Sequence, residues 1–256
     1  MNFLKKARIL LNAWYKRKER KQRLNETEIY SAVKFTALLG KTPNTSDYPV
    51  HPAYMQISLN KLKEIEEFKK SDKNKENLLV IIGDSLSDFT RGDLSCCYPQ
   101  LNLALAGQGS GYYDRILKDS YESLKPLNIK YLFMECWGNE FLSYFDLDTV
   151  KKHAENNYKL ARSMYPEAKI MLGTLPPVYD LYANICKYEF MNFLLKLIEN
   201  DSNSCVIDLN KSMSGFLGIM PKVDYSLEGV HFEGKGIIKY DELIKKGMKS
   251  SEKYVS

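Results

Sequence analysis

The sequence lacks several features that would assign it to well-known classes of protein. Its 256 residues contain no apolar run approaching the roughly 20 residues that a membrane-spanning helix requires. There is no CxxC pair, and the five cysteines and three histidines do not cluster with the spacing of zinc ligands. No internal repeat is evident. We therefore expect no metal site, and we expect the cysteines to be reduced, buried thiols.

Most of the chain also lacks an excess of basic charge, although the formal net charge is +5. Of the 37 Lys and Arg and 32 Asp and Glu, nine basic residues and one acid fall within residues 1–24. The rest of the chain is left with 28 basic and 31 acidic residues, a net charge of −3. A nucleic-acid-binding domain needs a basic face of its own. We therefore expect no nucleic-acid partner for the main domain, and only residues 16–23 leave that alternative open.

Residues 1–24 have the pattern of a basic amphipathic helix, with basic residues on one face. The opposite face gathers apolar and aromatic residues, namely Phe3, Leu4, Ala7, Leu10, Leu11, Trp14 and Tyr15. The segment has no small-residue cleavage site, so a signal peptide is disfavoured and we expect a cytoplasmic protein. Two placements of the apolar face stay open. It packs on the protein's own body or on a second subunit, or it lies in an anionic membrane surface.

The chain divides at about residue 77. Residues 1–77 are predicted to be a mainly helical N-terminal extension, with helices over 26–39 and 58–70 joined by a proline-rich connection. Residues 78–256 are predicted to form the main domain. There, short apolar runs at 78–82, 101–106, 129–134, 168–172 and 205–209 alternate with helical segments at 112–124, 147–164, 188–198 and 234–248. This alternation predicts an α/β fold, with a parallel sheet covered by helices on both faces.

In such a fold ligands bind at the carboxyl ends of the strands, so the residues after each run are the candidates for a site. Gly83-Asp84-Ser85-Leu86-Ser87 follows the first run. It differs from the G-x-S-x-G nucleophile turn, because Ser87 stands where the second glycine belongs. The Ser85 hydroxyl would lie at a helix N-terminus, although the motif taken alone is better explained by a plain turn in which Asp84 or Ser85 caps the next helix.

Further small and polar residues follow the second and third runs. Gly107-Gln108-Gly109-Ser110-Gly111 lacks the last glycine of a dinucleotide fingerprint, because residue 112 is Tyr112. Gly107 can instead offer its backbone N–H at close approach. Asn139 is placed either to donate a hydrogen bond into the same crevice or to cap a helix. Near the C-terminus, His231 is a candidate general base, and Glu228 is placed three residues earlier to orient it.

In this order, the segments around Ser85, Gly107, Asn139 and His231 resemble the four sequence blocks of the SGNH, or GDSL-type, hydrolase family. The resemblance covers residues 78 to about 248. It implies a three-layer α/β/α fold with a five-stranded parallel sheet of flavodoxin-like order. It also implies serine-dependent cleavage of esters or thioesters, without a metal or cofactor.

The resemblance also implies a role for each matching residue. Ser85 would be the nucleophile and His231 the general base, while the Ser85 N–H, the Gly107 N–H and the Asn139 amide would form the oxyanion hole. The chain departs from the family pattern in two blocks. Glu228 stands in place of the usual triad Asp, with Asp224 as an alternative orienting group. Trp137 and Glu140 stand where the third block usually has Gly and Asp.

We expect the substrate to be a small-molecule or glycan ester carrying a small acyl group such as acetyl. The expected pocket-lining residues are Asp84, Trp137, Glu140 and Tyr179. Three alternatives stay open: an acyltransferase with the same triad, a lipid or thioester hydrolase, and a non-catalytic binding protein on this fold.

Overall fold

The computed structural model describes residues 41–71, 77–90, 99–135, 137–178, 180–215, 222, 225–226 and 230–256. The amphipathic segment 1–24 and the helix predicted at 26–39 lie outside the described residues, as do Tyr179, Asp224 and Glu228. Within the described ranges, none of the helices combines the length and apolar character needed to cross a bilayer.

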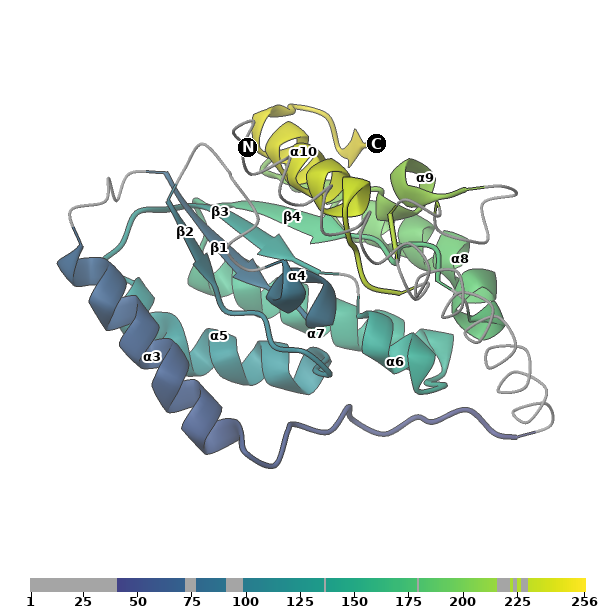
Figure 1. Cartoon of the computed structure of the whole chain (residues 1–256), viewed down its shortest axis with the longest axis horizontal. Helices are drawn as coiled ribbons and strands as arrows, with labels where there is room; N and C mark the ends of the chain where they lie inside the picture. Colours follow the sequence, from purple (N-terminus) through teal and green to yellow (C-terminus); the bar gives the residue numbers. More distant parts are fainter. Residues whose placement is uncertain are drawn as a thin grey trace.

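Six parallel strands form a single sheet at the centre of the described chain (Figure 1). They are β1 (Leu78–Ile82), β2 (Gln100–Asn102), β3 (Ile129–Met134), β4 (Lys169–Gly173), β5 (Ser204–Ile207) and β6 (Tyr254–Val255), in the order β2-β1-β3-β4-β5-β6. The first five have the predicted flavodoxin-like order. The predicted number of five strands is wrong, because the C-terminal residues add β6 to the edge of β5 through the pairs Val206↔Tyr254 and Ile207↔Val255.

Helices cover both faces of the sheet, which confirms the predicted three-layer α/β/α fold (Figure 1). On one face lie α3 (Tyr54–Lys70), α5 (Ser110–Leu124), α6 (Gly138–Leu142), α7 (Leu147–Met164) and α8 (Leu181–Leu197). On the other lie α4 (Ser85–Phe89), α9 (Leu209–Met213) and α10 (Lys235–Lys249). The strands are buried on both sides: Val80 and Ile82 pack with the first group, and Leu79 and Ile81 pack with the second.

Most predicted elements lie where the sequence placed them, and α8 differs the most. It begins at Leu181 rather than at residue 188, because Asp180 accepts a hydrogen bond from the Ala183 N–H at 2.9 Å and so caps the helix. Among the described residues, Cys186 and Cys205 are buried free thiols, as predicted.

The described part of the predicted N-terminal extension shares the core of the main domain. α3 buries Ile65 and Phe68 in the same cluster as α5, and the Tyr54 hydroxyl donates to Asp119 Oδ2 at 2.6 Å. Residues 41–53, which we call the strap, run across the molecule before α3 begins (Figure 1). The strap is tied to the loop before α7, because the Asp146 N–H donates to the Asn44 carbonyl at 2.9 Å.

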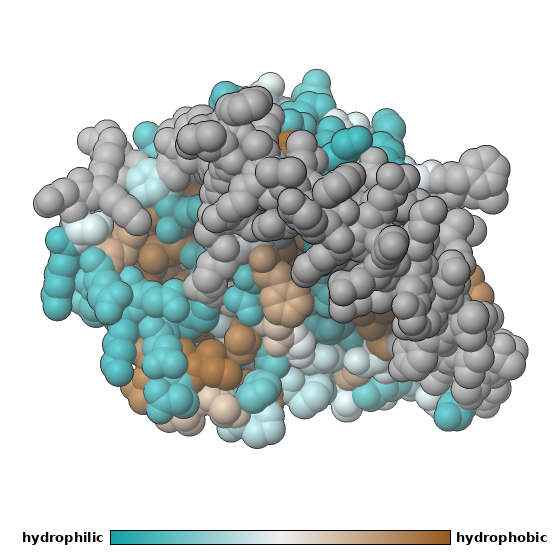
Figure 2. Space-filling model, viewed as in Figure 1, coloured by the Kyte–Doolittle hydropathy of each residue, from teal (hydrophilic) through white to brown (hydrophobic). Residues whose placement is uncertain are grey.

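Hydrophilic residues cover much of the described surface in the view of Figure 2, with apolar residues among them over the region that α3 occupies in Figure 1. On that helix Met55 and Leu59 are 73% and 51% exposed. Single exposed apolar side chains of this kind are common on globular proteins, so we assign no site to them.

Candidate active site

Ser85 and His231 are separated by 146 residues in the sequence, and the fold brings their side chains into contact. His231 Nε2 lies 2.8 Å from Ser85 Oγ. Ser85 is the first residue of α4, just beyond the carboxyl end of β1, and His231 lies in the loop that precedes α10. The Phe89 ring packs on the imidazole with the ring centroids 4.7 Å apart. The geometry allows the imidazole to accept the hydroxyl proton.

The protonation of His231 suits that role. Burial lowers the pKa of the imidazole below its ordinary value of 6.5, because the charged form loses hydration. The imidazole is therefore mostly neutral at pH 7. A neutral imidazole that faces a serine hydroxyl can act as a general base.

Asp84 fixes the turn that presents Ser85. Its Oδ1 accepts a hydrogen bond from the Leu86 N–H at 3.0 Å, which caps α4, and its Oδ2 accepts one from Asn139 Nδ2 at 3.3 Å. Burial raises the pKa of Asp84 to about 6. The Asp84 side chain is 3% exposed and beside Ser85, and its predicted place in the wall of the substrate pocket stays a prediction.

Asn139 links the Ser85 turn to the Gly107 turn. Its Nδ2 also donates to the Gln108 carbonyl at 2.9 Å. Gly107 has a φ of +74°, in the left-handed region that favours glycine. The three predicted oxyanion donors thus come from two connected turns and the start of α6, at the carboxyl end of the sheet.

The buried side chain of Glu135 holds the turn that carries Ser85, which we call the serine turn. Sequence reasoning missed this residue. Glu135 follows β3 and is fully buried, and its Oε2 accepts a hydrogen bond from the Ser87 N–H at 3.0 Å. Burial and, secondarily, the nearby Asp84 raise its pKa well above 4.5. A neutral carboxylic acid is therefore favoured at this position up to a higher pH than usual.

Trp137 does not have the predicted role of lining a substrate pocket. The indole is fully buried, and its Nε1 donates to Asn157 Oδ1 at 2.7 Å. The ring packs edge-on against Tyr113 and Phe190, with centroids 6.1 and 5.8 Å apart. The Trp137 backbone has a φ of +51°, in the left-handed region that favours glycine, so packing of the ring in the core must offset backbone strain at this position.

Glu140 was also predicted to line the pocket, and the structure corrects that as well. The side chain is fully buried. Its Oε1 accepts hydrogen bonds from the Ser110 hydroxyl and from the Ser110 N–H, the latter at 3.2 Å, and lies 3.2 Å from His153 Nδ1. Glu140 therefore joins α6 to the first turn of α5 and to α7.

The strap packs directly on the Gly107 turn, a contact that the sequence did not predict. The Tyr48 hydroxyl donates to the Gly107 carbonyl at 3.3 Å, and the His51 N–H donates to Gln108 Oε1 at 2.9 Å. A Cβ on Gly109 would lie 3.0 Å from the Tyr48 ring, and one on Gly111 would lie 2.6 Å from the Tyr48 carbonyl oxygen. Gly109 and Gly111 were the sequence signal from which this contact could have been predicted, because residues without a Cβ allow the strap to approach closely.

The remaining predicted site residues, Glu228 and Tyr179, lie outside the described residues, so the acid of the triad and that pocket wall stay predictions. Among the described residues, no group of three or more His, Cys, Asp and Glu side chains could hold a metal ion.

No family model matches the chain, and no curated protein does. Solved structures do match. A GDSL-like lipase from Bacteroides thetaiotaomicron has a TM-score of 0.55 at 15% identity, over 75% of this chain and 98% of that one. A lipase from the goat rumen metagenome has a TM-score of 0.53 at 17% identity, over 68% and 99%. A catalytic mutant of an acetylxylan esterase from Geobacillus stearothermophilus has a TM-score of 0.51 at 15% identity, over 68% and 94%. The chain therefore has the fold of these proteins.

Proposed function

We propose that this protein is a serine-dependent hydrolase of carboxylic esters, an esterase of the SGNH or GDSL type. The observation that carries the proposal is the 2.8 Å contact between Ser85 Oγ and the Nε2 of a buried His231. The ordered resemblance of the four sequence blocks and the shared fold support the same activity.

The proposed reaction begins with proton transfer. His231 Nε2 takes the hydroxyl proton while Ser85 Oγ attacks the ester carbonyl carbon, and the carbonyl electron pair moves onto oxygen. The Ser85 N–H and the Gly107 N–H stabilise that oxyanion, and Asn139 Nδ2 joins them by exchanging its 3.3 Å hydrogen bond to Asp84 for one to the oxyanion. His231 then gives its proton to the departing alcohol, which leaves an acyl group on Ser85. A water molecule, deprotonated by the same imidazole, releases the acid and regenerates the serine.

Hydrolysis of p-nitrophenyl acetate by the full chain tests this function. We expect Ser85→Ala and His231→Ala each to lower kcat by about 10³-fold or more, as removal of a nucleophile or its base does in serine hydrolases. Ser163→Ala, which alters an exposed serine on α7, should retain the wild-type rate. Absence of turnover by the wild-type chain would favour a non-catalytic binding protein.

For the substrate, we propose a small acyl group, such as acetyl, carried by a carbohydrate. One protein that shares the fold is an acetylxylan esterase, and lipases share the fold too. The length of the acyl chain of the substrate is therefore the property to test. We expect kcat/KM for p-nitrophenyl esters to fall from acetate to decanoate, and acetylated xylan to release acetate. A preference for decanoate would support a lipid substrate. Transfer of acetyl to an added sugar, rather than to water, would identify an acyltransferase.

We also propose that the chain acts in the cytoplasm, and that residues 1–24 contact the body, a second subunit or a membrane surface. The amphipathic projection of residues 1–24 supports such a contact. Sedimentation with vesicles containing anionic lipid, for the full chain and for a chain lacking residues 1–24, separates the membrane contact from the protein contacts.

A further inference from the structure

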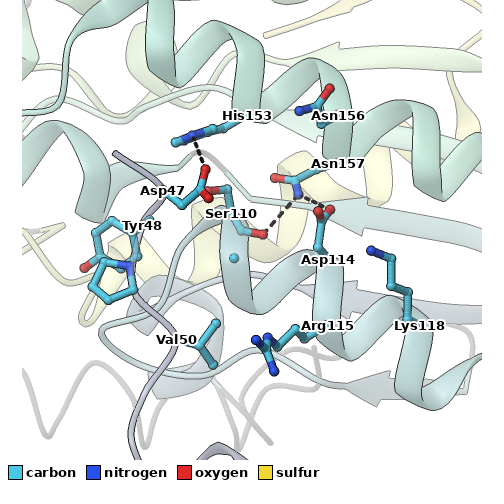
Figure 3. Close-up of a pocket in the computed structure, with 12 residues that line it drawn as sticks. Asp47, Tyr48, Val50, Ser110, Asp114, Arg115, Lys118, His153, Asn156 and Asn157 are labelled. Atoms are coloured by element: carbon cyan, nitrogen blue, oxygen red, sulfur yellow. Dashed lines mark hydrogen bonds and ion pairs between the residues drawn. The ribbon is translucent and has the colours of Figure 1, made fainter. Parts of the chain in front are cut away.

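We propose that a polar pocket beside the Gly107 turn binds a sugar unit of a glycan ester (Figure 3). The pocket has a volume of about 560 Å³ and lies between the strap, the first turns of α5 and the middle of α7. That volume lies within the range found for small-molecule sites. The assignment of the sugar to the substrate rests on the proposed esterase function, whereas the binding of a sugar by the pocket does not.

The inner wall of the pocket is held in place before any ligand arrives. Ser110, His153 and Asn157 line it, and all three are buried. Asn157 Nδ2 donates to the Ser110 carbonyl at 3.1 Å and to Asp114 Oδ1 at 2.6 Å (Figure 3). On its other side, the buried Glu140 holds both Ser110 and His153. A wall fixed in this way loses little conformational freedom when a ligand binds.

The charges around the pocket are balanced. Arg115 and Lys118 on α5 supply two cations, and Asp47 and Asp114 supply two carboxylates (Figure 3). His153 lies between two acids, with Nε2 3.6 Å from Asp47 Oδ1 and Nδ1 3.2 Å from the buried Glu140 Oε1. The Arg115 guanidinium lies 5.8 Å from the centroid of the Tyr54 ring. A balanced set of this kind creates no strong preference for an anion or a cation. It offers donors and acceptors together, which suits the hydroxyl groups of a neutral sugar.

The pocket is connected to the candidate oxyanion turn through one side chain. Tyr48 lines the pocket, and its hydroxyl donates to the Gly107 carbonyl at 3.3 Å. The side chain of Val50, also on the strap, adds apolar surface for the C–H groups of a sugar ring. Through Tyr48, the pocket adjoins the turn whose Gly107 N–H is proposed to bind the oxyanion.

Calorimetric titration tests the pocket without requiring turnover. The full chain with Ser85→Ala is titrated with xylotetraose, cellotetraose and chitotetraose, and we expect at least one to bind. Adding Arg115→Ala and Lys118→Ala should raise the Kd about tenfold or more, since two charged hydrogen-bond donors are lost. Lys63→Ala is the matched control, because it removes an exposed lysine from α3, and it should leave the Kd unchanged.

A second variant tests the pocket by filling it. Asn156 lies at its exposed edge, so Asn156→Trp should block sugar binding without disturbing the buried wall. Failure of all three sugars to bind at up to about 10 mM would overturn the pocket assignment. So would binding that neither the double variant nor Asn156→Trp weakens, with folding verified by thermal denaturation.

The outcomes also separate this inference from the proposed function. Sugar binding that depends on the pocket, in a chain that does not hydrolyse p-nitrophenyl acetate, would sustain the pocket and refute the esterase. Hydrolysis of p-nitrophenyl acetate without sugar binding would sustain the esterase and refute the pocket.

Discussion

Gly83 lies directly against the side chain of Glu135, and a Cβ added at residue 83 would be 2.8 Å from Glu135 Cβ. This contact joins the carboxyl ends of β1 and β3 immediately before the serine turn. The sequence presents Gly83 as part of a Gly-Asp-Ser motif, and the structure supplies the reason for the glycine. A larger residue would displace the carboxyl group that holds the Ser87 N–H.

Replacing Gly83 should therefore weaken the fold around the serine turn. We expect Gly83→Ala to lower the free energy of unfolding by about 1–3 kcal/mol, the usual effect of overpacking a well-packed site. Urea unfolding of the variant and the wild-type chain measures the difference. Equal unfolding midpoints would contradict this, because they would show that the contact with Glu135 relaxes without loss of stability.

The buried carboxyl of Glu135 should make stability depend on pH. Its pKa in the folded protein is raised well above 4.5, mainly by burial, so the folded state holds its proton more tightly than the unfolded state does. Stability therefore falls as the pH rises above about 4.5 toward the folded-state pKa. Glu135→Gln keeps an acceptor for the Ser87 N–H and removes the titration.

We expect the stability of Glu135→Gln, relative to the wild-type chain, to increase as the pH rises from 4.5 toward 8. Urea unfolding of both proteins at several pH values gives this difference directly. A difference that is constant across the range would mean that Glu135 titrates normally in the folded protein.

Tyr48 should act as a positioning residue for the Gly107 turn. Tyr48→Phe removes the hydrogen bond to the Gly107 carbonyl, and we expect kcat for p-nitrophenyl acetate to fall about fivefold, the effect of one neutral hydrogen bond. The pH profile should not move, because His231 is untouched. Tyr182→Phe is a matched control, since it removes a 2.6 Å hydrogen bond to the Phe145 carbonyl, and it should leave kcat unchanged. Equal losses in both variants would argue for a general structural effect.

The rate of ester hydrolysis should report the lowered pKa of His231. Only the neutral imidazole accepts the Ser85 proton, so kcat/KM should rise with pH and reach half of its plateau below pH 6.5. A pH profile for p-nitrophenyl acetate measures this midpoint. A midpoint above 6.5 would indicate that another group, such as the predicted carboxylate Glu228, outweighs burial.

Local sequence patterns were sufficient to predict the fold and the central contact of the site. The alternation of buried strands and amphipathic helices predicted a parallel sheet with helices on both faces, and the family resemblance implied the strand order. The short blocks around Ser85 and His231 predicted two side chains that the sheet brings to 2.8 Å. These features depend on residues that are close in sequence or on a topology that many chains share.

The parts that sequence reasoning missed depend on packing between distant segments. The Trp137 side chain points into the core, where it packs against Tyr113 on α5 and Phe190 on α8. No local sequence pattern reveals these contacts. The contact of Tyr48 with Gly107 joins the strap to a turn 59 residues away. β6 has only two residues, too few for a strand pattern to be detected.

The most direct test of the central claim is labelling by a fluorophosphonate probe, followed by mass spectrometry of the modified peptide. We predict one phosphonate per chain, on Ser85, because the adjacent His231 activates that hydroxyl. Labelling should vanish in Ser85→Ala and persist in Ser163→Ala. Labelling that survives in Ser85→Ala, or that maps to another residue in the wild-type chain, would contradict the assignment of Ser85 as the nucleophile.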